Sequence, residues 1–112
     1  MTGTDGYGCS WRFFDGVREA IKDLGAEGAA LLSTAASRYG KGTALPRHVK
    51  NLGDGILEIR VNAGNNHYRL LFFHPLPHIA VGLVAFYKNS NKTPPRLLAL
   101  ARERKRLWER AG

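Results

Sequence analysis

The stretch LEIRVNAGNNHYRLLFF, residues 57–73, alternates apolar and polar side chains on both sides of a short polar turn. Alternation with a period of two is typical of paired β-strands that bury one face. A two-residue turn at Gly64-Asn65 and a four-residue loop over 63–66 both give the same register. In that register the apolar side chains of the two strands share one face, and this agreement supports the pairing.

The register also defines the cross-strand neighbours. They are Asn62 with His67, Arg60 with Arg69, Glu58 with Leu71, Val61 with Tyr68, Ile59 with Leu70 and Leu57 with Phe72. Tyr68 and Phe72 are therefore expected to pack beneath helices. These two strands and the apolar strand that follows them predict a β-sheet of at least three strands as the centre of the fold.

The opposition of Arg60 and Arg69 is unusual, because directly opposed like charges destabilise a sheet, whereas an opposite pair contributes about 0.2–1 kcal/mol. An anion between the two guanidiniums would relieve the repulsion, and planar guanidiniums bind phosphate bidentately. We therefore hypothesise that these arginines form a phosphate clamp on an uncovered sheet face. Two alternatives stay open: Glu58 pairs diagonally with one arginine, or the face is simply solvated.

Outward from the hairpin, the chain predicts one α+β domain of order β-α-α-β-β-β-α, with a mostly antiparallel sheet and helices on one face. A flexible N-terminus is expected over residues 1–8 and the domain over 9–112. Residues 40–55 are predicted to form a basic loop. The expected elements are a strand at 9–14, helices at 16–24 (N-cap Asp15) and 27–39, strands at 56–62, 67–74 and 79–88, and a helix to about 109 with Thr93 as N-cap and Pro94 at N1.

Basic residues are concentrated in the second part of the chain. The net charge is +8. Residues 1–40 contain four Lys/Arg and five Asp/Glu, whereas residues 41–112 contain thirteen Lys/Arg and four Asp/Glu. Such segregation favours a polyanionic partner, either nucleic acid, an acidic lipid surface or an acidic protein. Solubility is the alternative explanation, although it would not require the segregation.

The remaining composition predicts a cytoplasmic protein without a metal or other cofactor. Cys9 is the single cysteine, which excludes an internal disulfide and favours a reducing compartment. The four histidines show no zinc-binding spacing. No apolar run approaches the ~20 residues that span a bilayer, and the opening MTGTDGYG lacks the features of a signal peptide.

Other polar residues are expected at the edge of the proposed clamp. Lys88 ends the third strand and Lys92 precedes the last helix, so both are candidates for the rim, although lysines here are also ordinary solvated residues. Free N–H groups after Thr93 offer an additional anion site. His67, beside the two arginines, is a candidate proton shuttle or an ordinary polar residue at a turn.

Three motifs together resemble the RelE/ParE toxin superfamily, in its HigB-like and phage-derived branch. They are HVKNLGDGILEIR, NNHYRLLFF and VGLVAFYKNSNKTPPRLLALARER, within residues 48–104. The resemblance implies a RelE-like fold and the toxin of a type II toxin–antitoxin pair. RelE-type toxins are metal-independent endoribonucleases that cut mRNA, commonly on the ribosome, through attack by the ribose 2′-hydroxyl.

The resemblance also assigns residues. Arg60, Arg69 and Lys88 match basic positions that share the catalytic work in the family, and His67 and Lys88 are the candidates for acid–base roles. A second set is expected to bind RNA: Lys41, Arg47, Lys50, Lys92 and Arg96. The expected partners are mRNA, the ribosome and an antitoxin, which we expect to be a small helix-turn-helix protein.

This chain departs from the family pattern in two places. Glu58 stands where some RelE toxins have a basic residue, and neither a tyrosine nor a histidine follows Lys92. Two other functions therefore stay open. ParE-like relatives inhibit DNA gyrase without catalysis, and a basic nucleic-acid-binding module would have no toxic activity.

Overall fold

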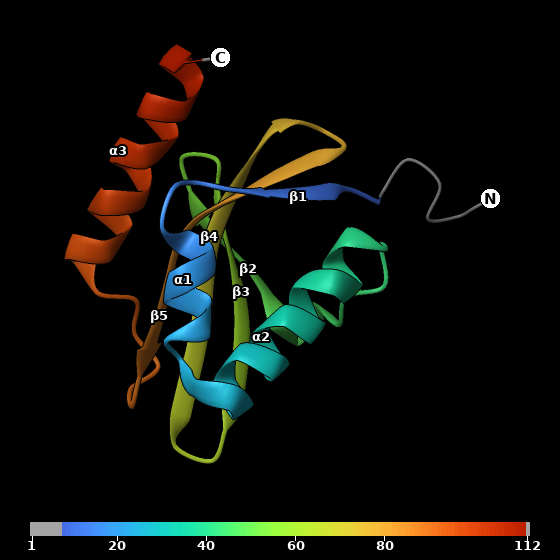
Figure 1. Cartoon of the computed structure of the whole chain (residues 1–112), viewed down its shortest axis with the longest axis vertical. Coiled ribbons are helices and arrows are strands. Elements are labelled where there is room, and N and C mark those ends of the chain that lie inside the picture. Colours follow the sequence, from blue (N-terminus) through green and yellow to red (C-terminus); the bar gives the residue numbers. More distant parts are fainter. Residues whose placement is uncertain (1–7, 112) are drawn as a thin grey trace.

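The computed structural model describes residues 8–111. The expected flexible N-terminus lies outside the described residues, except for Gly8. Three α-helices and five strands form the domain (Figure 1). In chain order they are β1 (Ser10–Phe13), α1 (Val17–Lys22), α2 (Gly25–Gly40), a 3-10 turn η1 (Pro46–His48), β2 (Val49–Gly53), β3 (Ile56–Ala63), β4 (Asn66–Leu76), β5 (Ile79–Lys88) and α3 (Pro95–Ala111).

The five strands form one sheet in the order β1-β5-β4-β3-β2. β1 runs parallel to β5, and every other neighbouring pair is antiparallel. The predicted α+β class with a mostly antiparallel sheet is confirmed. No helix of the described residues is both long enough and apolar enough to cross a membrane.

The predicted register of the central hairpin is confirmed. Arg60 pairs with Arg69, Asn62 with His67, and Ala63 with Asn66, so the chain reverses through the two residues Gly64 and Asn65. Gly64 has a φ of 60°, which a residue with a side chain adopts less readily. The hairpin therefore forms as the alternating pattern and turn length require.

Helices α1 and α2 cover one face of the sheet. Tyr68, Leu70 and Phe72 of β4 point to this face and pack with Leu32 of α2, each at most 5% exposed. Gly28 allows the close approach of α2, because a Cβ there would lie 2.4 Å from the Tyr68 ring. The expected burial of Tyr68 and Phe72 is thus confirmed.

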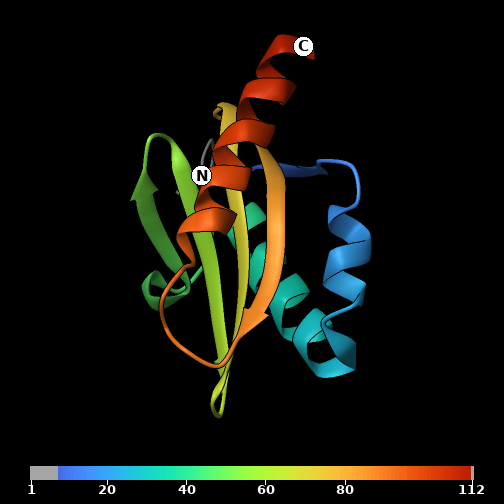
Figure 2. The same ribbon diagram turned by 90° about the vertical axis from the view of Figure 1, so that its left-hand side faces the viewer.

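Helix α3 packs on the opposite face, so the expectation that all helices lie on one face is wrong (Figure 2). Leu71, Phe73, Val81 and Leu83 point to this second face and are buried beneath α3, where they contact Ala101. The apolar stripe of α3 requires such a surface, and β5 provides one because it is apolar on both faces. The helix covers the apolar part of this face and leaves a polar part.

The predicted basic loop at 40–55 contains an additional strand, β2, which pairs with β3. The turn between them is Asp54-Gly55, with φ values of 56° and 80°. Two positive φ values are the signature of a type I′ hairpin turn, for which Asp-Gly is a preferred sequence. The Asp-Gly pair was therefore the sequence signal for β2.

Two predicted helix caps are also wrong. Helix α1 has Gly16 as its N-cap, with a φ of 88° and no side-chain cap, rather than Asp15. Helix α3 begins at Pro95, and the carbonyl of Pro94 accepts bonds from the N–H groups of Leu97 and Leu98. The Thr93 hydroxyl instead donates to Glu58 at 2.6 Å, because a buried carboxylate is a stronger acceptor.

Candidate functional site

The polar part of the α3 face consists of rows of cross-strand neighbours. One row contains Asn62, His67 and Lys88, from β3, β4 and β5. The next contains Arg60 and Arg69. A third row places Lys50 of β2 beside Glu58 and Leu71. The sheet therefore brings together Arg60, Arg69, His67 and Lys88, as the sequence predicted.

The protein itself fills the space between the two arginines, so the expectation that this part of the sheet face is bare is wrong, whereas phosphate binding by the pair stays a prediction. Oε1 of Glu58 lies 3.4 Å from Nε of Arg60 and 3.8 Å from Nε of Arg69. Oδ1 of Asn91 accepts a bond from Nη2 of each arginine, at 2.8 and 2.9 Å. The alternative that Glu58 pairs with an arginine is confirmed, and it extends to both.

Arg69 is a buried structural cation, with 2% of its surface exposed. Besides Glu58 and Asn91, it bonds to Oδ1 of Asn62, to the backbone carbonyls of Val61 and Tyr68, and to Nδ1 of His67. Burial lowers the pKa of its guanidinium, Glu58 raises it and Arg60 lowers it. All three guanidinium nitrogens are engaged, so Arg69 is suited to hold its neighbours in place.

Arg60 is more accessible, because its side chain is 22% exposed. Its Nε faces Glu58 and its Nη2 donates to Asn91, while Nη1 makes no hydrogen bond with the described residues. A free, fixed N–H group of this kind can donate to a phosphoryl oxygen. Of the two arginines, Arg60 is therefore the more accessible to a ligand while Asn91 is in place.

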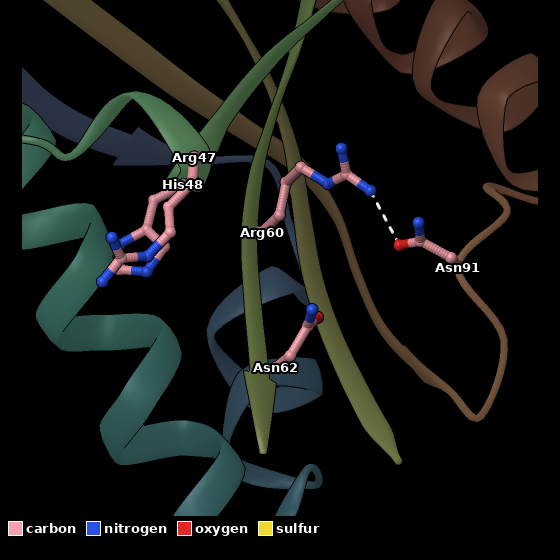
Figure 3. Close-up of a pocket in the computed structure, with 5 residues that line it drawn as sticks. All are labelled: Arg47, His48, Arg60, Asn62 and Asn91. Atoms are coloured by element: carbon pink, nitrogen blue, oxygen red, sulfur yellow. Dashed lines mark hydrogen bonds between the residues drawn. The ribbon is translucent and has the colours of Figure 1, made fainter. Parts of the chain in front are cut away.

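A polar cleft of about 400 Å³ opens beside Arg60 (Figure 3). Arg47 and His48 of η1, Arg60 and Asn62 of β3, and Asn91 from the 89–94 loop line this cleft. Arg47 was predicted as an RNA-binding residue, whereas His48, Asn62 and Asn91 were not predicted for the site. The cleft offers two guanidiniums, an imidazole and two amides, a set that suits a phosphodiester and the adjoining sugar.

His48 has no polar partner for one ring nitrogen. Its Nδ1 is buried and makes no hydrogen bond with the described residues. Burial, followed by the charges of Arg47 and Arg38, lowers the pKa of its imidazole below the ordinary value. The lowered pKa favours the neutral form of His48 near pH 7, and a neutral imidazole has one nitrogen without a proton.

His67 is held in one tautomer by Arg69. Nη2 of Arg69 lies 3.1 Å from Nδ1 of His67, and a guanidinium nitrogen only donates. Nδ1 must accept this bond, so the proton of the neutral ring is on Nε2. In this arrangement the Nε2–H group of His67 can donate a hydrogen bond, and the ring has no free nitrogen to accept one. Lys88 is its cross-strand neighbour in the same row.

The other predicted RNA-binding residues do not line the cleft. Lys50, Lys92 and Arg96 are exposed, on β2, in the 89–94 loop and in the first turn of α3. Lys41 is exposed at the C-terminal cap of α2, which belongs to the helical layer on the other side of the sheet. Their roles stay predictions.

Acids, histidines and cysteines hold metal ions where three or more of these side chains lie close together. Within residues 8–111, no group of three or more such side chains is close enough to hold an ion. The side chains of the cleft and of the neighbouring rows can bind an anion, donate hydrogen bonds from fixed cations and transfer protons through an imidazole.

Comparison with known proteins gives two findings. The family of phage-derived Gp49-like proteins (DUF891) matches residues 19–106. A relative named "Probable endoribonuclease HigB1", from Mycobacterium tuberculosis strains CDC 1551 / Oshkosh and ATCC 25618 / H37Rv, is 36% identical over 109 residues. The aligned region covers 91% of this chain and 86% of the relative.

Proposed function

This chain belongs to the family of phage-derived Gp49-like proteins, and from this membership we propose that it is the endoribonuclease toxin of a type II toxin–antitoxin pair. The resemblance to HigB-like and phage-derived toxins is confirmed, since one comparison gives the phage-derived family and the other a HigB relative. The proposed substrate is mRNA, cut while it is bound to the ribosome.

The cleft beside Arg60 is the feature that supports this function best. It is lined by the guanidiniums of Arg47 and Arg60 and by the neutral imidazole of His48, on the strongly basic part of the chain. Cationic donors fixed in a partly buried site stabilise negative charge that develops in a transition state. Cleavage of a phosphodiester needs such donors at the phosphoryl oxygens.

The proposed reaction is an internal transfer. The ribose 2′-oxygen attacks the neighbouring phosphorus, the O2′–P bond forms and the P–O5′ bond breaks, which leaves a 2′,3′-cyclic phosphate and a 5′-hydroxyl. His48 takes the proton of the 2′-hydroxyl, because its imidazole lines the cleft and is neutral. The ammonium of Lys88 supplies a proton to the leaving 5′-oxygen, while Arg60 and the Nε2–H group of His67 donate hydrogen bonds to the phosphoryl oxygens.

The remaining partners follow from the toxin assignment. An antitoxin neutralises such an enzyme between uses, and we propose a small helix-turn-helix protein for this role. The exposed cations Lys41, Lys50, Lys92 and Arg96 lie outside the cleft and are proposed to bind RNA phosphates. A toxin that acts on translated messages works in the cytoplasm, which is the proposed location.

Expression of the chain in bacteria without an antitoxin tests the function. Growth should stop, and mapping of RNA 5′ ends should show new cuts within translated messages. Arg60→Ala should lower the cleavage rate by about 10²–10³-fold, the usual cost of one transition-state donor. Arg18→Ala, on the opposite side of the sheet, is the matched control and should leave cleavage unchanged.

Intact transcripts and normal growth, with the protein shown to be folded, would contradict the proposal. Toxicity that survives Arg60→Ala and is accompanied by inhibition of DNA gyrase would favour the ParE-like alternative instead. Arg69→Ala is a poor test, because this buried cation also holds Asn62, His67 and Asn91.

A further inference from the structure

Asn91 occupies the position between two guanidiniums that an anion would occupy. Its Oδ1 accepts a hydrogen bond from Nη2 of Arg60 and another from Nη2 of Arg69, at 2.8 and 2.9 Å. Figure 3 shows the Asn91 amide directed at Arg60. One partly negative oxygen shared by two guanidiniums is the arrangement in which a phosphoryl oxygen is also bound.

The charge at this position is incompletely balanced. Arg60 and Arg69 contribute two positive charges, and the buried carboxylate of Glu58 contributes one negative charge on the Nε side of both. Asn91 is neutral, so its amide supplies a hydrogen-bond acceptor but no charge. A phosphodiester supplies both, and charge-assisted hydrogen bonds are about twice as strong as neutral ones.

Asn91 can leave this position without disturbing the core. It lies in the 89–94 loop, where residues 89–92 are exposed. The loop is fixed at its ends, by Lys88 at the end of β5 and by the bond from Thr93 to Glu58. Among the described residues, the two arginines are the hydrogen-bond partners of the Asn91 side chain.

We propose that Asn91 is a displaceable occupant of an anion site between Arg60 and Arg69, and that a phosphate group of the ligand takes its place. The inference rests on the proposed function for the identity of the ligand, an RNA phosphodiester, but not for the existence of the site. In the free protein Asn91 satisfies both arginines. When phosphate binds, Asn91 turns outward with its loop. The apparent affinity for phosphate is therefore the intrinsic affinity of the open site multiplied by the fraction of molecules in which Asn91 has left the arginines.

Substitution of Asn91 tests the site through two changes of opposite effect. Asn91→Ala removes the occupant, so the Kd for inorganic phosphate should fall about threefold or more. Asn91→Asp replaces the amide with a carboxylate that pairs with both arginines, so the same Kd should rise about tenfold or more. Asn89→Ala, in the same exposed loop, is the matched control and should leave the Kd unchanged. The side-chain N–H resonances of Arg60, followed by NMR during the titration, report binding at this site.

Three results would overturn the proposal. They are weaker phosphate binding by Asn91→Ala, binding by Asn91→Asp that equals or exceeds that of Asn91→Ala, and no effect of either change. Asn91→Ser, whose side chain is too short to reach both arginines, should repeat the result of Asn91→Ala and guards against a folding artefact. Because phosphate binding requires no cleavage, this site can fail while the nuclease function holds, and the reverse is also distinguishable.

Discussion

At the scale of single residues, Glu58 holds the site together. Its carboxylate is 1% exposed and lies between the Nε atoms of two arginines, while Thr93 donates to its other oxygen. A buried carboxylate with three polar partners stabilises the native state mainly because its loss leaves those partners uncompensated. Glu58 thus explains how Arg60 and Arg69 tolerate each other before any ligand binds.

Glu58→Gln should destabilise the protein by on the order of 3 kcal/mol, because two neighbouring guanidiniums lose their counter-charge. Denaturant unfolding of the purified protein measures this change. Glu109→Gln is a matched control, since Glu109 forms an exposed pair with Lys105 at 3.1 Å and should cost about 0.5 kcal/mol or less. Equal losses in both variants would show that Glu58 has no special structural role.

His48 gives a prediction on pH. Burial first, and then Arg47 and Arg38, lower the pKa of its imidazole from the ordinary value of 6.5. The unfolded chain therefore binds this proton at a higher pH than the native protein. The contribution of His48 to the free energy of unfolding is present above about pH 6.5 and is lost as the pH falls through the native pKa.

An NMR titration of the His48 ring should give a midpoint below 6.5. Arg47→Ala should raise that midpoint, because it removes a nearby positive charge. Cleavage should also decline as the pH falls through the same midpoint, since a protonated His48 cannot accept the proton of the 2′-hydroxyl. A midpoint at or above the ordinary value, unchanged by Arg47→Ala, would contradict this account.

At the scale of secondary-structure elements, β2 and its turn determine where the cleft begins. β2 pairs with β3 and follows η1 directly, so the hairpin fixes Arg47 and His48 beside Arg60. The Asp54-Gly55 turn has two positive φ values, which only a few residue types adopt without strain. The cleft therefore depends on a local turn that contains none of its own residues.

Gly55→Ala should lower the free energy of unfolding by about 1–2 kcal/mol, the cost of a left-handed conformation for a residue with a Cβ. Asp54→Asn is the matched control, since asparagine tolerates a positive φ and the exposed pair with Arg102 at 3.1 Å is worth less than about 1 kcal/mol. Thermal or chemical unfolding distinguishes them. A Gly55→Ala protein as stable as Asp54→Asn would contradict the assigned turn.

Helix α3 divides its face of the sheet into two parts. Its apolar side covers Leu71, Phe73 and Leu83, and Arg104 donates to the carbonyl of Leu83 at 2.7 Å. The preceding 89–94 loop crosses toward the polar part, where Asn91 and Thr93 make their bonds. The position of α3 thus directs the loop that completes the site.

At the scale of the whole molecule, the basic surplus of residues 41–112 coincides with the cleft and α3. Binding of single-stranded RNA should weaken steeply with salt, because cations that neutralise phosphates release counterions. Each phosphate contact that is removed should reduce the slope of log K against log salt by about 0.7. Arg47→Ala combined with Lys50→Ala should therefore flatten the dependence measurably.

Titrations of a 2′-O-methyl RNA oligonucleotide, which cannot undergo attack by its 2′-oxygen, measure this slope without cleavage. Arg18→Ala is the control, since Arg18 lies in α1 and stacks 4.7 Å from the Phe13 ring on the far side of the sheet. A slope unaffected by loss of Arg47 and Lys50 would place the RNA elsewhere on the protein.

The sequence by itself determined the central hairpin, the strand pairing and the approach of Arg60 to Arg69. These features are local, because a period of two and a two-residue turn fix which side chains share a face. The additional strand β2 could also have been predicted from the sequence, because Asp54-Gly55 is a preferred hairpin turn. The sequence did not show which face of the sheet α3 covers, because an apolar strand such as β5 does not specify which helix packs on each of its faces.

Only the tertiary structure decided what lies between the two arginines. Glu58 meets Thr93 across 35 residues of sequence, and Asn91 meets Arg60 across 31 and Arg69 across 22. These contacts depend on the path of the 89–94 loop, which α3 sets by packing on the sheet. No short-range pattern encodes such a path, because it results from burial of an apolar helix face at a distant position in the chain.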